Sequence, residues 1–309
     1  HIAYTYYSHF LTNAMGEQNE MAARKKCLTH FRKTITKLNK ALHTVQINQC
    51  EQMWRSIDFD KHVTSITLRK QSHAFQNITK KNNPRDNKTE SAQEDRMQCA
   101  NNYKDFITRC ANKESTAKGS NVSMTDFVKS ALESSGNDME KMIINSQWEH
   151  NGQKTQKLGN IIPMVDTSAS MECDNGVPLY SAIALGIRVA EKSALGRRIL
   201  TFDANPEWVN LDSIEEHDFV SMAKKIKESS WGMNTNFYKA LKLILDTAVT
   251  REIAPETLEN MVLAVFSDMQ IDFASTENMD TMFNTITKMY AEAGLKSKFK
   301  QQYSPRHIL

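Results

Sequence analysis

Apolar residues in the first half of the chain recur in steps of three and four, the spacing of one face of a helix. The clearest run begins at Leu28 and continues through Phe31, Ile35, Leu38, Leu42 and Val45. It predicts a long helix whose apolar stripe packs in a hydrophobic core. Shorter helices are expected at 46–57, 65–78, 94–110, 125–134 and 139–148, with a polar loop at 80–93. These segments predict an all-helical, helical-repeat-like domain over residues 1–155, with no internal repeat at a fixed period.

The second half changes to short, β-rich apolar runs that alternate with amphipathic helices. Strands are expected at 161–165, 198–202 and 261–267, with a short antiparallel edge strand at 208–211. Helices are expected at 179–193, 218–228, 237–248 and 280–293. Such alternation is typical of a doubly wound sheet with helices on both faces. The sequence therefore predicts an α/β domain over residues 156–309.

Polar side chains follow the first of these strands at a spacing of two. In the segment IIPMVDTSASM, Asp166, Ser168 and Ser170 come directly after the apolar run. Ligands of open α/β sheets bind just outside the carboxyl ends of the strands. Three oxygen side chains on such a turn suit a hard divalent cation. A plainer interpretation is that the aspartate and the serines only cap the start of the following helix.

Two later residues supply further oxygen ligands. Thr235 lies in a Gly-containing loop at the start of an amphipathic helix, and Asp268 ends the strand-like run MVLAVFSD. Asp268 therefore has the same position as Asp166, at the carboxyl end of a central strand. A phosphotransferase of the haloacid dehalogenase type needs a second aspartate two residues after the first. Ser168 occupies that position, so this alternative is excluded.

These five residues together resemble the metal-ion-dependent adhesion site of von Willebrand factor A domains, whose pattern is DxSxS, a loop threonine and a strand-end aspartate. The resemblance implies Mg²⁺ as the ion, with Mn²⁺ or Ca²⁺ as alternatives. It implies direct coordination by Ser168, Ser170 and Thr235. Asp166 and Asp268 would bind the ion or accept hydrogen bonds from its ligands. Such a site leaves one coordination position for a carboxylate of an acidic protein partner.

A second resemblance rests on longer segments: MWRSIDFDKHVTS, EDRMQC, KGSNVSMTDFV, WGMNTNFYKAL and VFSDMQIDFAS. They are similar to an uncharacterised family, found in eukaryotes and large DNA viruses, that joins an all-helical domain to a C-terminal von Willebrand A domain. One departure is Ala169, where that family has glycine in DxSGS. The architecture is similar to that of the Ro autoantigen, in which helical repeats (TROVE) bind RNA. The resemblance also implies that this chain lacks the last strand and helix of an A domain.

Charge is distributed unevenly over a chain whose net charge is +3. Residues 1–155 hold 23 Lys and Arg against 16 Asp and Glu, whereas residues 156–309 hold 16 against 20. A basic helical half suits a polyanion such as RNA, although a solvated helix surface often carries as many cations. The candidate nucleic-acid residues lie on the first long helix, at Arg24, Lys25, Arg32, Lys33, Lys37 and Lys40.

The cysteine content and the absence of certain motifs limit where this protein is expected to reside and what class of function it has. Five cysteines without a CxxC pair indicate reduced thiols in the cytoplasm. No apolar run suits a membrane span, and the first residues lack the features of a secretory signal. The sequence contains no nucleophile–base pair, GxSxG elbow, phosphate loop or paired catalytic carboxylates, so we expect no enzyme activity.

Three non-enzymatic functions follow from these observations. The favoured one is an adaptor that binds an acidic protein through the metal site. The alternatives are an Ro-like RNA-binding component of a ribonucleoprotein and a structural component of a viral particle, which would place the protein in the virion.

Overall fold

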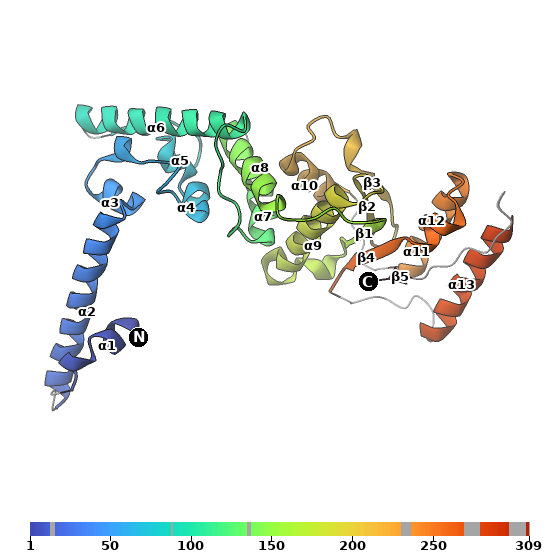
Figure 1. Ribbon diagram of the computed structural model, residues 1–309, viewed down its shortest axis with the longest axis horizontal. Helices are drawn as coiled ribbons and strands as arrows, with labels where there is room; N and C mark the ends of the chain where they lie inside the picture. Colours follow the sequence, from blue (N-terminus) through green and yellow to red (C-terminus); the bar gives the residue numbers. More distant parts are fainter. Residues whose placement is uncertain are drawn as a thin grey trace. The chain divides into compact units, whose positions relative to one another are not determined.

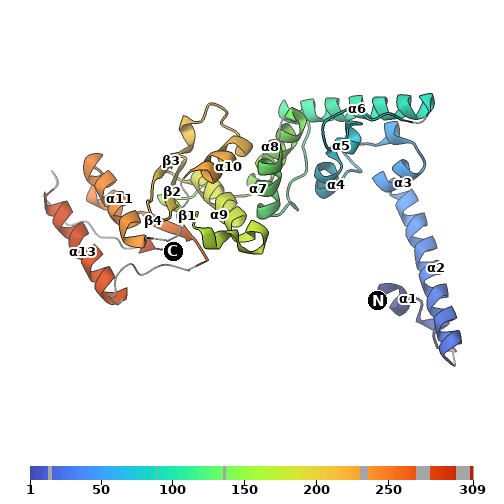
Figure 2. The ribbon, with the colours of Figure 1, turned by 180° about the vertical axis from the view of Figure 1, so that it is seen from behind.

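The computed structural model describes residues 1–12, 16–87, 89–134, 137–229, 236–268, 279–296 and 307–308. The chain forms two compact units, His1–Ser115 and Thr116–Leu309. Figures 1 and 2 show the ribbon from opposite sides. The first unit is helical and the second combines strands with helices, which confirms the predicted change of fold class along the chain.

Two long helices dominate the first unit, with short helical segments between them. The helices are α1 (Ile2–Tyr6), α2 (Glu17–Ala41), α3 (Val45–Cys50), α4 (Ser65–Lys70), α5 (Ser72–Phe75) and α6 (Glu90–Ala111), with 3-10 turns η1 (Ser8–Phe10) and η2 (Trp54–Ser56). The sequence predicts single helices at 46–57 and 65–78, but each is broken in two. In the first case, the carboxylate of Asp95 accepts hydrogen bonds from the backbone amides of Trp54 (2.8 Å) and Arg55 (3.0 Å). Those amides are therefore satisfied outside a continuous helix.

The core of the first unit is a cluster of aromatic side chains. Phe59 lies at the centre, with ring centroids 5.1 Å from Phe75, 5.2 Å from Tyr103 and 5.9 Å from Phe106. All of these rings are buried, and their edge-to-face, tilted and stacked pairs are favourable beyond the area they bury. Because Tyr103 and Phe106 belong to α6, this helix holds the short segments of the unit together.

In the described residues, the predicted apolar stripe is covered near the start of α2 and again at Val45, which begins α3. Ala23 and Cys27 are buried on the part of α2 that α1 packs against. Farther along the helix, Ile35, Leu38 and Leu42 are 36%, 52% and 64% exposed. The prediction that this stripe packs in a core is therefore wrong for the second half of the helix.

The second unit contains one mixed sheet. Its strands are β1 (Ile161–Asp166), β2 (Arg198–Phe202), β3 (Trp208–Asn210), β4 (Val262–Phe266) and β5 (His307–Ile308). In the described residues their order is β3-β2-β1-β4-β5, and only the β2–β3 pair is antiparallel. The predicted strands and the predicted antiparallel edge are confirmed to within one residue at each end.

Helices cover both faces of this sheet. Successive strand residues point to opposite sides, and both faces carry buried apolar side chains. Val165 and Ile199 pack with α9 (Cys173–Lys192) and α10 (Phe219–Glu228) on one face. Met164 and Leu200 pack with α11 (Phe237–Thr250) and α13 (Met279–Lys296) on the other. The short helix α12 (Pro255–Glu259), which the sequence analysis does not predict, precedes β4. Gly186 of α9 brings its helix close to the sheet, since a Cβ there would lie 2.4 Å from Cγ2 of Val165.

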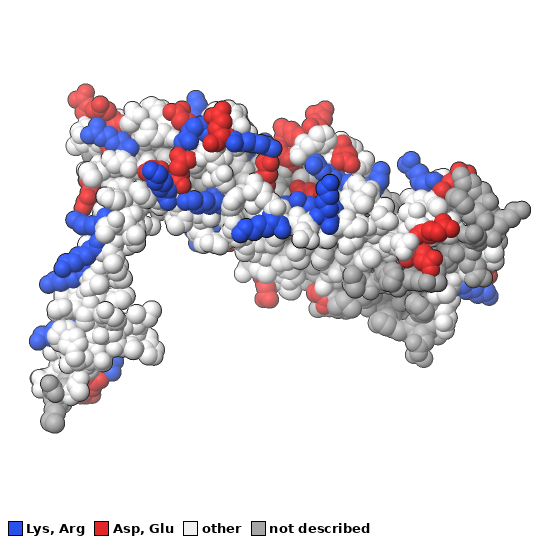
Figure 3. Space-filling model, in the orientation of Figure 1, with Lys and Arg blue, Asp and Glu red and all other residues white. Residues whose placement is uncertain are grey.

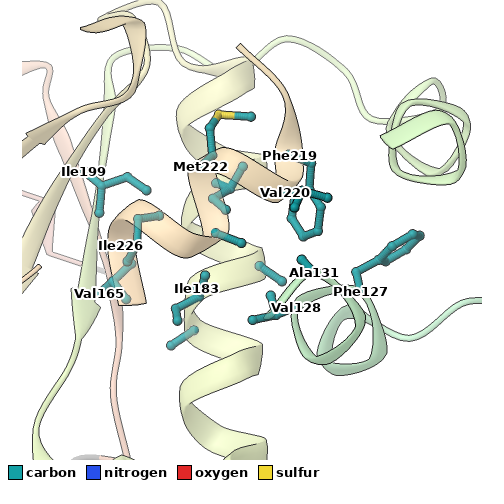
Figure 4. Packing of buried hydrophobic residues seen from close by; sticks show 14 of the residues in the cluster. Phe127, Val128, Ala131, Val165, Ile183, Ile199, Phe219, Val220, Met222 and Ile226 are labelled. Carbon is teal, nitrogen blue, oxygen red and sulfur yellow. The ribbon is translucent and has the colours of Figure 1, made fainter. Parts of the chain in front are cut away.

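Two helices from the predicted helical domain belong to this second unit. They are α7 (Met124–Glu133) and α8 (Asp138–Gly152), which pack on α9 and α10. The rings of Trp148 and Phe219 stack with centroids 3.9 Å apart, and Phe127 meets both edge-on. Figure 4 shows Val128 and Ala131 of α7 on the side that faces α9 and α10. The units therefore divide at Ser115 rather than at the predicted residue 155, because the apolar faces of α7 and α8 complete the core of the α/β unit.

A buried arginine connects α9 to α8. The guanidinium of Arg188 lies 3.7 Å from the centroid of the Trp148 ring and donates to the Trp148 carbonyl at 2.9 Å. It also forms an ion pair of 3.0 Å with Glu191. Burial lowers the pKa of Arg188, and the charge of Glu191 acts in the opposite direction. None of the helices described is long and apolar enough to cross a membrane.

Candidate metal centre

The predicted metal ligands gather at the carboxyl edge of the sheet. Asp166 is the last residue of β1, and Asp268 follows the end of β4 by two residues. Because β1 and β4 are parallel neighbours, with Val165 opposite Phe266, both aspartates lie at the same edge. The hydroxyl of Ser267 donates to Oδ2 of Asp166 at 2.5 Å, which ties the two strand ends together.

The turn after β1 places two predicted hydroxyl ligands side by side. Oδ1 of Asp166 accepts a hydrogen bond from the backbone amide of Ser168 at 2.9 Å. The hydroxyls of Ser168 and Ser170 lie 3.0 Å apart. Ser168 precedes a short 3-10 turn, η3 (Ala169–Glu172), but its side chain makes no capping hydrogen bond. The plainer interpretation of the motif as a helix cap therefore does not describe the Ser168 hydroxyl.

The backbone beyond this turn is unusual. Asp174, Asn175 and Gly176 have positive φ values of 49°, 59° and 77° at the start of α9. This left-handed region costs free energy for residues with a Cβ, and Asp and Asn tolerate it best. The motif therefore sits on an irregular segment ahead of the regular part of α9.

Asp166 carries an electrostatic cost in this position. It is completely buried, and this burial raises the pKa of its carboxyl. Hydrogen bonds from Ser168 and Ser267 lower the pKa, whereas the negative charge of Asp268 raises it further. A bound cation would offset the cost of keeping the buried Asp166 carboxylate charged beside Asp268.

The fifth predicted ligand, Thr235, lies outside the described residues. The next residue, Asn236, caps α11 by accepting a hydrogen bond from the Lys239 amide at 2.9 Å. The backbone amide of Asn236 donates to the carbonyl of Asp203 at 3.2 Å. The start of α11 therefore lies at the carboxyl end of β2, the neighbour of β1.

Two residues of this edge were missed by the sequence analysis. Asp203 follows β2 directly, is buried, and accepts a hydrogen bond from the Asn205 amide at 2.8 Å. Its signal was available, because TFD repeats the pattern of a carboxylate after a buried strand. The hydroxyl of Thr167 is buried and has no hydrogen-bond partner in the described part of the chain, and nothing in the sequence distinguishes it.

The side chains at this edge could bind a hard cation mainly through serine hydroxyls, with fewer carboxylates. Within the residues described, no three His, Cys, Asp or Glu side chains are grouped to hold a metal ion. The pair Ser168 and Ser170, the nearby Asp166 and the electrostatically coupled Asp268 supply oxygen donors. Oxygen ligands are those that Mg²⁺ prefers, and this ion keeps several waters rather than requiring a full protein cage.

The candidate nucleic-acid residues all lie on α2, in the first unit. All six are exposed, and Figure 3 shows Lys and Arg along that helix. Arg24 is paired with Glu20 at 2.6 Å and Lys40 with Glu51 at 2.9 Å. The remaining candidates are Lys25, Arg32, Lys33 and Lys37.

The known proteins that this chain resembles have descriptions that state no activity. Residues 160–298 match a family described as "Domain of unknown function (DUF7788)". The chain is also similar to "Uncharacterized protein L728" of Acanthamoeba polyphaga mimivirus, at 26% identity over 270 residues. That alignment covers 85% of this chain and 44% of the viral protein, so the chain spans less than half the length of this relative. No solved structure gives a significant match.

Proposed function

We propose that this protein is a non-enzymatic adaptor whose α/β unit resembles a von Willebrand factor A domain and binds an acidic partner protein through a Mg²⁺-dependent adhesion-type site. The ligands would be Ser168, Ser170 and Thr235, with Asp166 and Asp268 binding the ion or holding its waters. The observation that carries the proposal is the juxtaposition of the Ser168 and Ser170 hydroxyls beside the buried Asp166 carboxylate. A mostly parallel sheet with helices on both faces is consistent with it.

The division of labour among these residues follows from their contacts. The Ser168 amide and the Ser267 hydroxyl orient the two oxygens of Asp166, which leaves lone pairs for water or for a cation. The Ser168 side chain is not used in capping and is available as a donor. Mg²⁺, when bound, supplies a position that a carboxylate of the partner occupies. Because the partner's carboxylate would bind the ion itself, the interaction would be lost when the ion is removed.

Calorimetric titration of the full chain with MgCl₂ tests the metal site. We expect saturable binding at one site, weakened at least about tenfold by Asp166→Asn and by Ser168→Ala, as loss of ligands or of groups that orient them does elsewhere. Ser181→Ala is the matched control, because this half-buried serine of α9 donates its hydroxyl to the Val177 carbonyl of its own helix and is not one of the proposed ligands. Equal affinity in all four proteins would contradict the proposed site.

The partner is tested by crosslinking and pull-down from the native source. We expect a protein that EDTA or Asp166→Ala releases and that RNase leaves bound. Retention of the same protein in EDTA would separate its binding from the metal site and count against the adaptor proposal.

RNA binding by the first unit is the second candidate function. It is favoured by the exposure of Arg32, Lys33 and Lys37 on a helix that is uncovered over its second half. Phosphate contacts by such side chains weaken steeply with salt. We expect Lys33→Gln with Lys37→Gln to reduce both the affinity for RNA and its salt dependence, and Lys242→Gln on α11 to change neither. In the pull-down, defined RNA that survives EDTA would favour this candidate over the adaptor.

A further inference from the structure

A cavity of about 670 Å³ lies in the second unit, at the end of the sheet away from the candidate metal centre. Ile161 and Arg198 line it at the first residues of β1 and β2, and Thr250 lines it at the last residue of α11. The metal-site residues follow the other ends of the same strands. The cavity is therefore a separate site, and it does not depend on the function proposed above.

The interior of the cavity is apolar and its walls belong to regular elements. Ile162, Leu243, Ile244 and Leu258 line it from β1, α11 and α12. The indole of Trp208 forms another wall, and its N–H donates to the Thr247 hydroxyl at 2.9 Å, which fixes the ring against α11. Cavities of this size, mostly apolar and bounded by positioned side chains, are typical of small-molecule sites.

The charged groups of the lining are two arginines and one aspartate. The Arg251 guanidinium makes no hydrogen bond or ion pair with any described residue, and Arg198 uses one nitrogen to donate to the Leu195 carbonyl at 2.8 Å. The aspartate, Asp246, interacts electrostatically with the buried Tyr290 of α13. The lining therefore carries an excess of positive charge beside an apolar interior. A guanidinium offers a fork of donors that matches a carboxylate.

We propose that this cavity binds an amphipathic carboxylate, with an acyl chain against Trp208 and the α11 side chains and the carboxylate on Arg251 and Arg198. The apolar lining excludes a small hydrophilic anion, which would bury no apolar surface there. The exposed arginines favour an anionic head over a neutral one, because a charge-assisted hydrogen bond is stronger than a neutral one.

Calorimetry of the full chain with sodium decanoate, kept below the concentration at which it forms micelles, tests the proposal. We expect saturable binding of one decanoate per chain, and binding of decan-1-ol at least about tenfold weaker. Arg251→Gln weakens decanoate about tenfold and leaves decan-1-ol unchanged. Thr250→Trp, at an exposed position of the lining, weakens both ligands.

Lys242→Gln is the matched control, since it removes a positive charge from α11, which Arg251 follows directly, at an exposed residue that does not line the cavity. It leaves decanoate binding unchanged. Thermal unfolding shows that each variant is folded before titration. Absence of saturable decanoate binding to the wild type, or equal decanoate affinity in wild type, Thr250→Trp and Arg251→Gln, would overturn the proposal.

Discussion

The helices α2 and α9 are both long and both carry apolar residues at helical spacing, yet they differ in what they bury. Helix α9 has 20 residues and buries nine of them, including Ile183, Ile187 and Arg188. Helix α2 has 25 residues and buries only Ala23 and Cys27. Apolar periodicity therefore shows which face of a helix can be buried, but not whether another part of the chain covers it. Predictions about single residues of the two helices test this difference, and one about Asp166 of β1 tests the candidate metal centre.

The largest effect is expected from Arg188→Ala in α9. The substitution removes the cation that pairs with Glu191 and stacks on Trp148. Breaking a buried pair by deleting one partner costs about 3–5 kcal/mol of unfolding free energy. Urea denaturation followed by tryptophan fluorescence measures the loss. A loss below about 1 kcal/mol would show that Arg188 is less important to this interface than its contacts indicate.

A smaller loss is expected from Gly186→Ala. The added Cβ would lie 2.4 Å from Cγ2 of Val165, so α9 or β1 must shift. Overpacking of this kind costs about 1–3 kcal/mol, against a gain in helix propensity of at most about 1 kcal/mol. The same denaturation experiment applies, with the more exposed neighbour Leu185→Ala as control. Greater stability of Gly186→Ala would show that α9 does not approach the sheet this closely.

Asp166 should make stability depend on pH. Its pKa is raised in the folded protein above the ordinary value of 3.8, so the folded state binds more protons than the unfolded state between those two values. The free energy of unfolding then falls as the pH rises through that window, and the loss persists above it. Asp166→Asn removes this fall, and Mg²⁺ reduces it in the wild type if the proposed site binds the ion. Denaturation midpoints in EDTA and in MgCl₂, from pH 4 upwards, measure both effects.

The smallest effect is expected from Leu38→Ala in α2. Because more than half of this side chain is exposed, the loss should stay within about 0.5 kcal/mol. The matched substitution in α9, Ile183→Ala, removes a fully buried side chain and should cost about 2–5 kcal/mol. Circular dichroism during urea denaturation compares the two. Similar losses would mean that the stripe of α2 is covered in solution, which would remove the contrast between the helices.

The strands were the most predictable part of this fold. Runs such as RILTF are short, β-rich and bounded by polar residues, so their positions follow from local sequence. Helix ends were less predictable, because long-range contacts decide them. The two amides held by Asp95 interrupt a segment that is helical by pattern. Membership of a core was least predictable, since α7 and α8 have the composition of the helical half but the packing partners of the sheet.

Part of the candidate site was predictable because the positions of the strands follow from the local sequence. Asp166 and Asp268 follow recognisable strands, and topology then brings their ends to one edge. Asp203 has the same signal and was overlooked. The buried hydroxyl of Thr167 and the left-handed residues after the motif depend on backbone conformation, which the order of residue types does not specify.

The packing of α7 and α8 on the sheet unit has a practical consequence for making the protein. The matched family region starts at residue 160, whereas the compact unit starts at Thr116. A recombinant fragment cut at residue 160 would lose Trp148 and Phe127, and would present Phe219, Ile183 and the Arg188 charge to water. Such a newly exposed apolar surface promotes aggregation. Expression trials of the α/β unit should therefore begin at Thr116, and insolubility of a shorter fragment would reflect the missing helices rather than an unstable sheet.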